Sequence, residues 1–189
     1  MLGPGLVEDH IEHARAMAEM IGPPRGRFLD LGTGAGIPGV VLGLEWPATT
    51  GTLLDSRTRP TVFLIDLLAE LDLMDRLEVV TARAEDAARD PDRRAGYDLV
   101  VARGFASPAV TAECAVAFLT EGGRLAVSEP PDARAQDRWP KEGLAELGFT
   151  TPLEIRRSGE ATVAILTATG PPPDIYPRPS GRPGKRPLW

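Results

Sequence analysis

Three glycines at alternate positions form the clearest candidate site for chemistry in this sequence. They lie in the run Asp30-Leu31-Gly32-Thr33-Gly34-Ala35-Gly36, where glycine lets the backbone turn sharply and lets a ligand approach with no Cβ in the way. Free N–H groups at the start of a following helix would favour an anionic or polar ligand group.

The spacing of this loop separates it from two related phosphate-binding loops. A dinucleotide fingerprint requires a later third glycine and a small residue at the position that Ile37 occupies. No Gly-Lys-Ser/Thr follows, so the run is not a P-loop. The pattern therefore favours a ligand without phosphates, such as adenosine carrying a short zwitterionic tail.

Two carboxylates follow in the order that a nucleoside ligand would need. Asp55 ends the second predicted strand, where it can accept hydrogen bonds from ribose hydroxyls. Glu85 follows the third predicted strand, where an adenine edge would lie, although a solvated carboxylate at a helix start would look the same in sequence.

The elements that must position these residues alternate along the chain. Apolar spacing predicts helices over 5–21, 37–46, 59–73, 107–119 and 133–147. Short apolar runs between turn residues predict strands over 27–32, 52–55, 78–81, 97–103, 123–128, 152–157 and 161–167. The last two read as a hairpin turned at Ser158-Gly159. This order predicts an α/β, Rossmann-like domain with a seven-stranded, mostly parallel sheet and a C-terminal antiparallel hairpin.

The last twenty residues differ in composition from the rest of the 189-residue chain. We therefore expect one domain over 1–169, including the N-terminal helix, and a tail over 170–189. The tail holds seven prolines, which predict an extended backbone, and its net charge is +3 against −9 for the remainder. Its cations could bind phosphates, and they are Arg178, Arg182, Lys185 and Arg186.

Composition limits the other classes of function. The chain is 42% hydrophobic and 25% charged, as in soluble globular proteins, and no apolar run reaches the length of a membrane span. Cys114 is the only cysteine, which excludes an internal disulfide and a cysteine-based zinc site and places the thiol in the core. His10 and His13 lack further ligands, so no metal is expected and both are assigned to the surface or rim. With no signal-peptide pattern at the start, we expect a cytoplasmic monomer.

Four motifs resemble one bacterial enzyme family. They are Phe28-Leu-Asp-Leu-Gly-Thr-Gly-Ala-Gly-Ile-Pro-Gly39, Leu53-Leu-Asp-Ser56, Arg83-Ala-Glu85 and Val101-Ala-Arg-Gly-Phe-Ala-Ser107. Together with the ending Tyr176-Pro-Arg178, they resemble the small-subunit ribosomal RNA guanine-N7 methyltransferases, the glucose-inhibited division protein B (GidB, or RsmG) family. The resemblance covers nearly the whole chain from His10. It implies a class I methyltransferase fold, S-adenosyl-L-methionine as cofactor, and 16S ribosomal RNA or the small ribosomal subunit as partner.

The resemblance also assigns roles to particular residues. It implies cofactor contacts at Gly32, Ile37, Ala84, Glu85 and Arg103, in addition to Asp30, Gly34, Gly36 and Asp55 of the pattern above. Arg103 is the candidate catalytic residue, because an arginine can contact the guanine O6 and N7 edge. Phe105 could stack on a base or pack in the core, and Arg83 could hold a phosphate.

The expected chemistry agrees with the residues after the fourth strand. Guanine N7 carries a lone pair and no proton, so methyl transfer to it needs no strong general base. Exocyclic-amine methyltransferases carry an Asn/Asp-Pro-Pro-aromatic loop at this point, whereas this chain reads Arg103-Gly104-Phe105-Ala106. The sequence is thus consistent with methylation at guanine N7.

Three departures from the family bear on the substrate. The chain lacks several dozen residues that usually precede the helix with His10, and Pro60 stands where a basic residue is common. Ser128-Glu129-Pro130-Pro131 stands where a Lys-Gly pair is common. A small-molecule or protein methyltransferase on the same scaffold, and a non-catalytic S-adenosylmethionine-binding protein, are therefore the alternative hypotheses.

Overall fold

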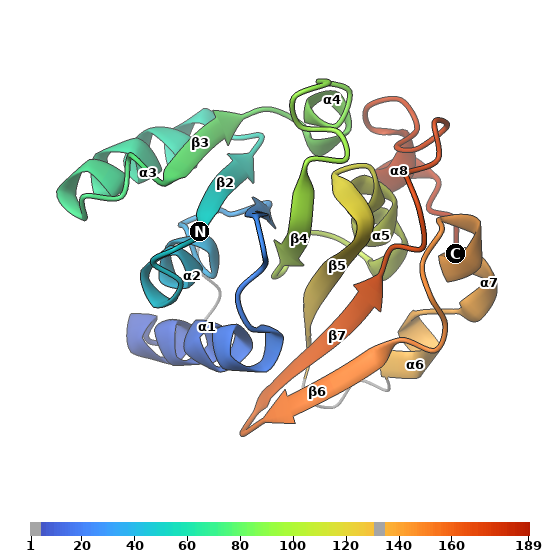
Figure 1. Cartoon of the computed structure of the whole chain (residues 1–189), viewed down its shortest axis with the longest axis horizontal. Helices are drawn as coiled ribbons and strands as arrows, with labels where there is room; N and C mark the ends of the chain where they lie inside the picture. The colour runs from blue at the N-terminus through green and yellow to red at the C-terminus, as the bar shows by residue number, and fades with distance from the viewer. Residues whose placement is uncertain (1–4, 131–134) are drawn as a thin grey trace.

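The computed structural model describes residues 5–130 and 135–189, which form one sheet with helices on both faces (Figure 1). The elements in chain order are α1 Val7–Ile21, β1 Arg27–Leu31, α2 Gly39–Glu45, β2 Thr50–Asp55, α3 Thr58–Glu70, β3 Leu77–Thr81, α4 Ala84–Ala87, β4 Tyr97–Ala102, α5 Pro108–Val116, β5 Leu119–Glu129, α6 Ala135–Arg138, α7 Lys141–Glu146, β6 Glu154–Ser158, β7 Ala161–Thr167 and α8 Arg182–Lys185.

The seven strands are ordered β3-β2-β1-β4-β5-β7-β6. The first five run parallel, whereas β7 pairs antiparallel with both β5 and β6. The predicted mostly parallel sheet and its closing hairpin are thus confirmed, with the turn at Gly159-Glu160, one residue later than expected. Because parallel strands end at the same edge, the loops after Leu31, Asp55 and Ala102 meet there.

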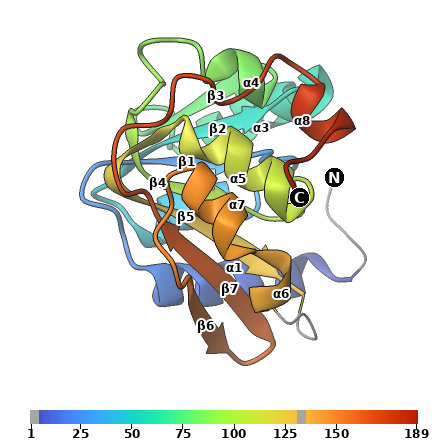
Figure 2. The same cartoon turned by 90° about the vertical axis from the view of Figure 1, so that its right-hand side faces the viewer.

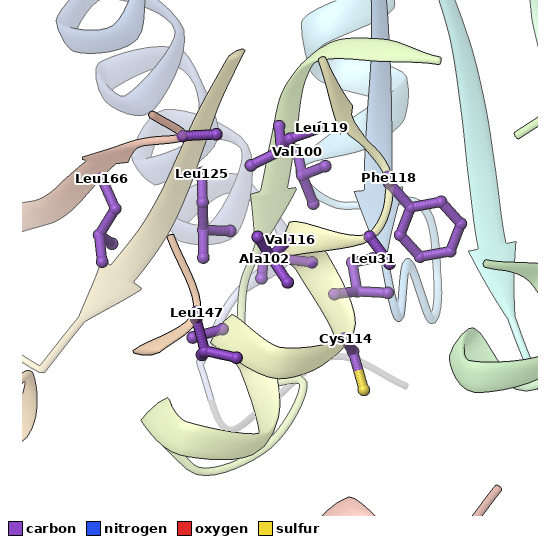
Figure 3. Close-up of a cluster of buried hydrophobic side chains, with 14 of the residues drawn as sticks. Leu31, Val100, Ala102, Cys114, Val116, Phe118, Leu119, Leu125, Leu147 and Leu166 are labelled. Atoms are coloured by element: carbon purple, nitrogen blue, oxygen red, sulfur yellow. The ribbon is translucent and has the colours of Figure 1, made fainter. Parts of the chain in front are cut away.

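Strand residues alternate between two apolar clusters, one on each face of the sheet. Leu29 and Leu31 of β1 pack with α4, α5 and α7, whereas Phe28 packs with α1, α2 and α3. Figure 3 shows part of the first cluster, with Leu31, Val100 and Leu125 among its strand residues. Cys114 lies in this cluster as expected, and burial raises the pKa of its thiol.

The prediction of one continuous helix over 133–147 is wrong. Within the described residues the chain forms two short helices, α6 and α7, with Trp139 and Pro140 between them. Figure 2 shows α6 and α7 as separate helices. Pro140 has an extended conformation, with φ −64° and ψ 137°, and it has no N–H to donate the hydrogen bond that would continue α6. Positions 133 and 134 lie outside the described residues.

Two further boundaries differ from the prediction. The helix expected to reach position 119 ends at Val116, and the following strand begins at Leu119 rather than at Gly123. Leu119 pairs with Tyr97 of β4 before the register shifts, so the sheet extends through the Gly122-Gly123 turn.

The C-terminal tail is not wholly extended, since α8 forms one helical turn within it. The tail also contacts the rest of the domain. Tyr176 is 3% exposed and donates its hydroxyl hydrogen bond to Glu146, while Arg94 donates to the carbonyl of Tyr176 at 3.0 Å. The amino-acid composition changes at the expected boundary at position 170, but hydrogen bonds join the tail to the domain before it. None of the helices in the described ranges has both the length and the apolar character of a membrane span.

Candidate active site

The glycine run forms a tight loop between β1 and α2. The backbone N–H groups of Gly32 and Thr33 both donate to the carbonyl of Leu54 in β2, at 2.8 and 2.9 Å. Gly32 has a φ of +76°, and a Cβ on it would lie 2.5 Å from Cδ2 of Phe105. The loop therefore needs glycine here both for its conformation and for the close approach of Phe105.

Asp30 supports this loop from beneath. Its side chain is buried, and Oδ2 accepts hydrogen bonds from Oγ1 of Thr33 at 2.7 Å and from the backbone N of Gly39 at 2.8 Å. Burial raises the pKa of Asp30 to about 6, although these hydrogen bonds oppose the shift. Asp30 thus holds the loop in position from beneath, and it is not among the residues that line the cavity beside the loop.

A cavity of about 290 Å³ opens beside the loop at the carboxyl edge of the sheet. Six residues singled out from the sequence line it, namely Gly32, Asp55, Arg83, Ala84, Glu85 and Phe105. Gly34, Gly36, Ile37 and Arg103 were expected to contact the cofactor too, but they are not among its lining residues. Gly36 faces the core instead, since a Cβ there would lie 2.7 Å from side-chain atoms of Leu64 and Val40. We call this space the first cavity.

Asp55 both lines the first cavity and fixes the loop. Its Oδ2 accepts from the backbone N of Gly34 at 2.9 Å, and its two oxygens accept from Nε and Nη2 of Arg57 at 3.0 Å each. Burial alone would raise the pKa of Asp55, but the hydrogen bonds from Arg57 and Gly34 lower it overall. Asp55 is therefore a stable carboxylate, and the half-exposed Arg57 covers the oxygens that a ribose would need.

Glu85 connects the first cavity to the C-terminal tail. Its Oε1 accepts a hydrogen bond from the backbone N of Gly181 at 2.8 Å and lies 3.6 Å from Nη2 of Arg83. The residue is 5% exposed, so it is not the solvated carboxylate considered from sequence. Its second oxygen remains available for a ligand, because no other described residue is bonded to it.

A second cavity, of about 400 Å³, adjoins the first and shares Gly104 and Phe105 with it. Arg103 lines this cavity, and one of its Nη atoms contacts Nδ1 of His10. Burial lowers the pKa of Arg103. His13, also in the lining, pairs through Nε2 with the hydroxyl of Ser128 at 2.9 Å.

The two histidines were expected at the surface or rim. His10 is instead 7% exposed. His13 is half-buried, and burial, with Arg103 and His10 nearby, lowers its pKa.

The four tail cations do not act as one group. Arg178 donates to Glu113 from Nε at 2.8 Å and from Nη2 at 2.6 Å, so it is committed to a buried carboxylate rather than open to RNA. Arg182, Lys185 and Arg186 are exposed and line a shallow concavity around α8. Only these three remain candidates for phosphate contacts from the tail.

Comparison with known proteins identifies the family. Residues 4–130 match the family model GidB, described as rRNA small subunit methyltransferase G. The chain is 34% identical over 171 residues to "Ribosomal RNA small subunit methyltransferase G" of Prochlorococcus marinus strain NATL2A, covering 86% of this chain and 67% of the relative. The protein of that name from Roseiflexus castenholzii is also 34% identical, over 97% of this chain and 80% of the relative.

The chain belongs to the GidB family. It spans about two thirds of the length of several curated relatives, as with the Synechococcus sp. strain JA-2-3B'a(2-13) protein, of which it covers 64%.

Solved structures support the fold of this GidB protein. A putative S-adenosyl-L-methionine-dependent methyltransferase from Methanococcus maripaludis superposes with a TM-score of 0.63 at 18% identity, over 85% of both chains. The T. Thermophilus 16S rRNA N2 G1207 methyltransferase in complex with AdoMet and guanosine gives 0.59 at 22% identity, over 91% of this chain and 43% of that one. The fold is therefore that of the class I methyltransferases.

Several residues of the GidB chain lie at the site although sequence reasoning did not select them. Ser56 and Arg57 line the first cavity, while His13, Arg138 and Trp139 line the second. Ser56 and Arg57 directly follow Asp55 at the end of β2, and this position after a parallel strand could have predicted that they lie at the site. No spacing connects Arg138 and Trp139 to the glycine loop, because they come from a separate segment more than one hundred residues later.

Proposed function

We propose that this GidB protein transfers a methyl group from S-adenosyl-L-methionine to N7 of a guanine in small-subunit ribosomal RNA. The observation that carries this proposal is the pair of adjoining cavities that share Phe105 and Gly104 beside the glycine loop. One cavity suits a nucleoside cofactor and the other a base, and methyl transfer requires the two ligands to be held in line. Family membership supports the ribosomal RNA substrate.

The residues of the first cavity fit S-adenosyl-L-methionine. Gly32 lines this cavity, and Asp55 supplies an ionised acceptor for ribose hydroxyls. Ribose binding requires Arg57 to release at least one of its bonds to Asp55, which its 56% exposed side chain can do. The free oxygen of Glu85 can accept from an adenine amino group. The cofactor, when bound, supplies an electrophilic methyl group on a sulfonium.

The residues of the second cavity have a positioning task. Phe105 offers a face for a guanine ring, and Arg103 offers N–H donors to its O6. Holding O6 fixes the ring in its plane and leaves the N7 lone pair free to attack. Because N7 carries no proton, the reaction needs no strong general base. The lowered pKa of His13 makes its imidazole a weak base, which is consistent with this chemistry.

Arg182, Lys185 and Arg186 would bind RNA phosphates outside the cavities. We further propose that the protein works in the cytoplasm as a monomer. Sedimentation at working concentration tests the monomer, because a dimer would contradict it.

The substrate is tested with methyl-labelled cofactor. Purified protein is incubated with small ribosomal subunits, naked ribosomal RNA, or a cell extract of proteins and metabolites, with Gly34→Asp as the inactive control. We expect label in RNA. Label in protein or metabolites would instead support the alternative substrates, and cofactor binding without transfer to any fraction would support a non-catalytic binding protein.

A further inference from the structure

A second arginine lies in the wall of the second cavity. Arg138 ends α6 and lines the cavity together with Glu129 and Trp139. Its Nη1 lies 2.7 Å from Oε2 of Glu129, whose side chain is fully buried, while the Arg138 side chain is 33% exposed. Arg138 is therefore the exposed member of the ion pair, and Glu129 the buried one.

Neighbouring aromatic residues fix this arrangement. The indole Nε1 of Trp139, a residue only 1% exposed, donates to Oε1 of Glu129 at 2.9 Å. The indole Nε1 of Trp189 donates to the backbone carbonyl of Arg138 at 3.1 Å. The pair is therefore held from both sides, and Arg138 needs little reordering to receive a ligand.

The guanidinium of Arg138 retains donors for that ligand. Its approach to Glu129 has the distance of an ion pair but not the angles of a hydrogen bond, so Oε2 of Glu129 has no hydrogen-bond partner among the described residues. Arginine carries five N–H donors in a planar fork that matches phosphate oxygens. Because Arg138 donates no hydrogen bond to Oε2 of Glu129, its N–H donors remain available to a ligand.

We propose that Arg138 binds the phosphate of the nucleotide whose base enters the second cavity. This inference rests on the proposed RNA substrate and adds the group that holds the nucleotide's backbone. Arg138 is assigned to the phosphate rather than to N7, because a cation at N7 would oppose the positive charge that methylation places on the guanine.

The experiment compares three ligands that separate base from phosphate. Guanosine, guanosine 5′-monophosphate and inorganic phosphate are titrated into protein saturated with S-adenosylhomocysteine, and the Trp139 indole N–H resonance reports binding. In the wild type we expect the monophosphate to bind about tenfold or more tightly than guanosine, the scale of a charge-assisted hydrogen bond. Arg138→Gln should remove this preference and leave guanosine affinity unchanged.

Three further variants protect the test against misfolding and general charge effects. Arg138→Gln alone leaves Glu129 buried without its partner, so the double variant Glu129→Gln/Arg138→Gln repeats the measurement with no buried charge. Arg25→Gln removes an equally charged, exposed side chain just before β1, at the opposite edge of the sheet, and should keep the full preference. Glu129→Gln alone should keep or increase it, because Arg138 then bears an uncompensated charge.

Each outcome bears on a separate claim. If the double variant still prefers the monophosphate as the wild type does, or the wild type shows no preference, the assignment of Arg138 is overturned. If inorganic phosphate binds as tightly as the monophosphate, the site is a general anion site and the nucleotide assignment is overturned. Failure of guanosine to bind any variant would count against the proposed guanine substrate instead, so the two failures are distinguishable.

Discussion

The ion pair between the tail and α5 allows a quantitative test of how the tail is attached. Glu113 is 0% exposed and accepts three bonds from Arg178: from its backbone N at 2.9 Å, from Nε at 2.8 Å and from Nη2 at 2.6 Å. Arg178→Met keeps the backbone bond and the length of the side chain but leaves the carboxylate without its counter-charge. Breaking a buried pair from one side costs about 3–5 kcal/mol, a large part of the ~5–15 kcal/mol stability of a typical domain.

Urea unfolding followed by circular dichroism measures this loss. Arg186→Met is the matched control, because it removes an exposed cation from the same tail and should change the unfolding free energy by no more than about 0.5 kcal/mol. Glu113→Gln/Arg178→Met removes the buried charge as well, so it should recover part of the loss. A loss below about 1 kcal/mol for Arg178→Met, equal to that of the control, would refute the view that this pair holds the tail.

Three other measurements test the loop and the first cavity. Burial raises the pKa of Asp30 to about 6 from 3.8, so the stabilisation from its protonated form is complete below pH ~4 and lost as pH rises through 6. Asp30→Asn should therefore gain up to about 3 kcal/mol over the wild type between pH 4 and 7 in urea unfolding; parallel pH curves would contradict this. Asp55→Ala should weaken S-adenosylhomocysteine binding about 10- to 100-fold in calorimetry and lower the stability of the free protein by about 1–2 kcal/mol, since Gly34 loses its acceptor; unchanged affinity would exclude the ribose role. Deleting residues 176–189 should weaken the same binding, because Gly181 holds Glu85; full affinity after deletion would contradict that link.

Local patterns were sufficient to predict most of the fold. Each strand is a short apolar run bounded by turn residues. Because the strands are buried on both faces, such runs can be recognised in the sequence without knowing which strands pair. The break between α6 and α7 was missed because helical spacing continues through Pro140, although proline alone predicts the end of a helix. The single turn of α8 was hidden by the prolines around it.

The candidate site was predictable only where its residues follow strands. Gly32, Asp55 and Glu85 each come directly after a parallel strand, and such positions meet at one edge of the sheet. The buried position of Asp30 depends on Thr33 and Gly39 folding over it, and the bond from Gly181 to Glu85 joins positions 96 residues apart. No periodicity encodes contacts of this kind, so the second cavity and the internal use of Arg178 emerged only from the structure.

Mapping the methylated atom shows whether this protein methylates N7 of a guanine in small-subunit ribosomal RNA. Small-subunit RNA from a strain lacking the protein is incubated with enzyme and S-adenosyl-L-methionine, then treated with borohydride and aniline, which cleave the strand at N7-methylguanine. We expect cleavage at one guanine, dependent on cofactor and absent with Gly34→Asp. Transfer of methyl groups to the RNA without cleavage would contradict guanine N7 as the acceptor, and no transfer to RNA by protein that binds the cofactor would contradict the proposed function.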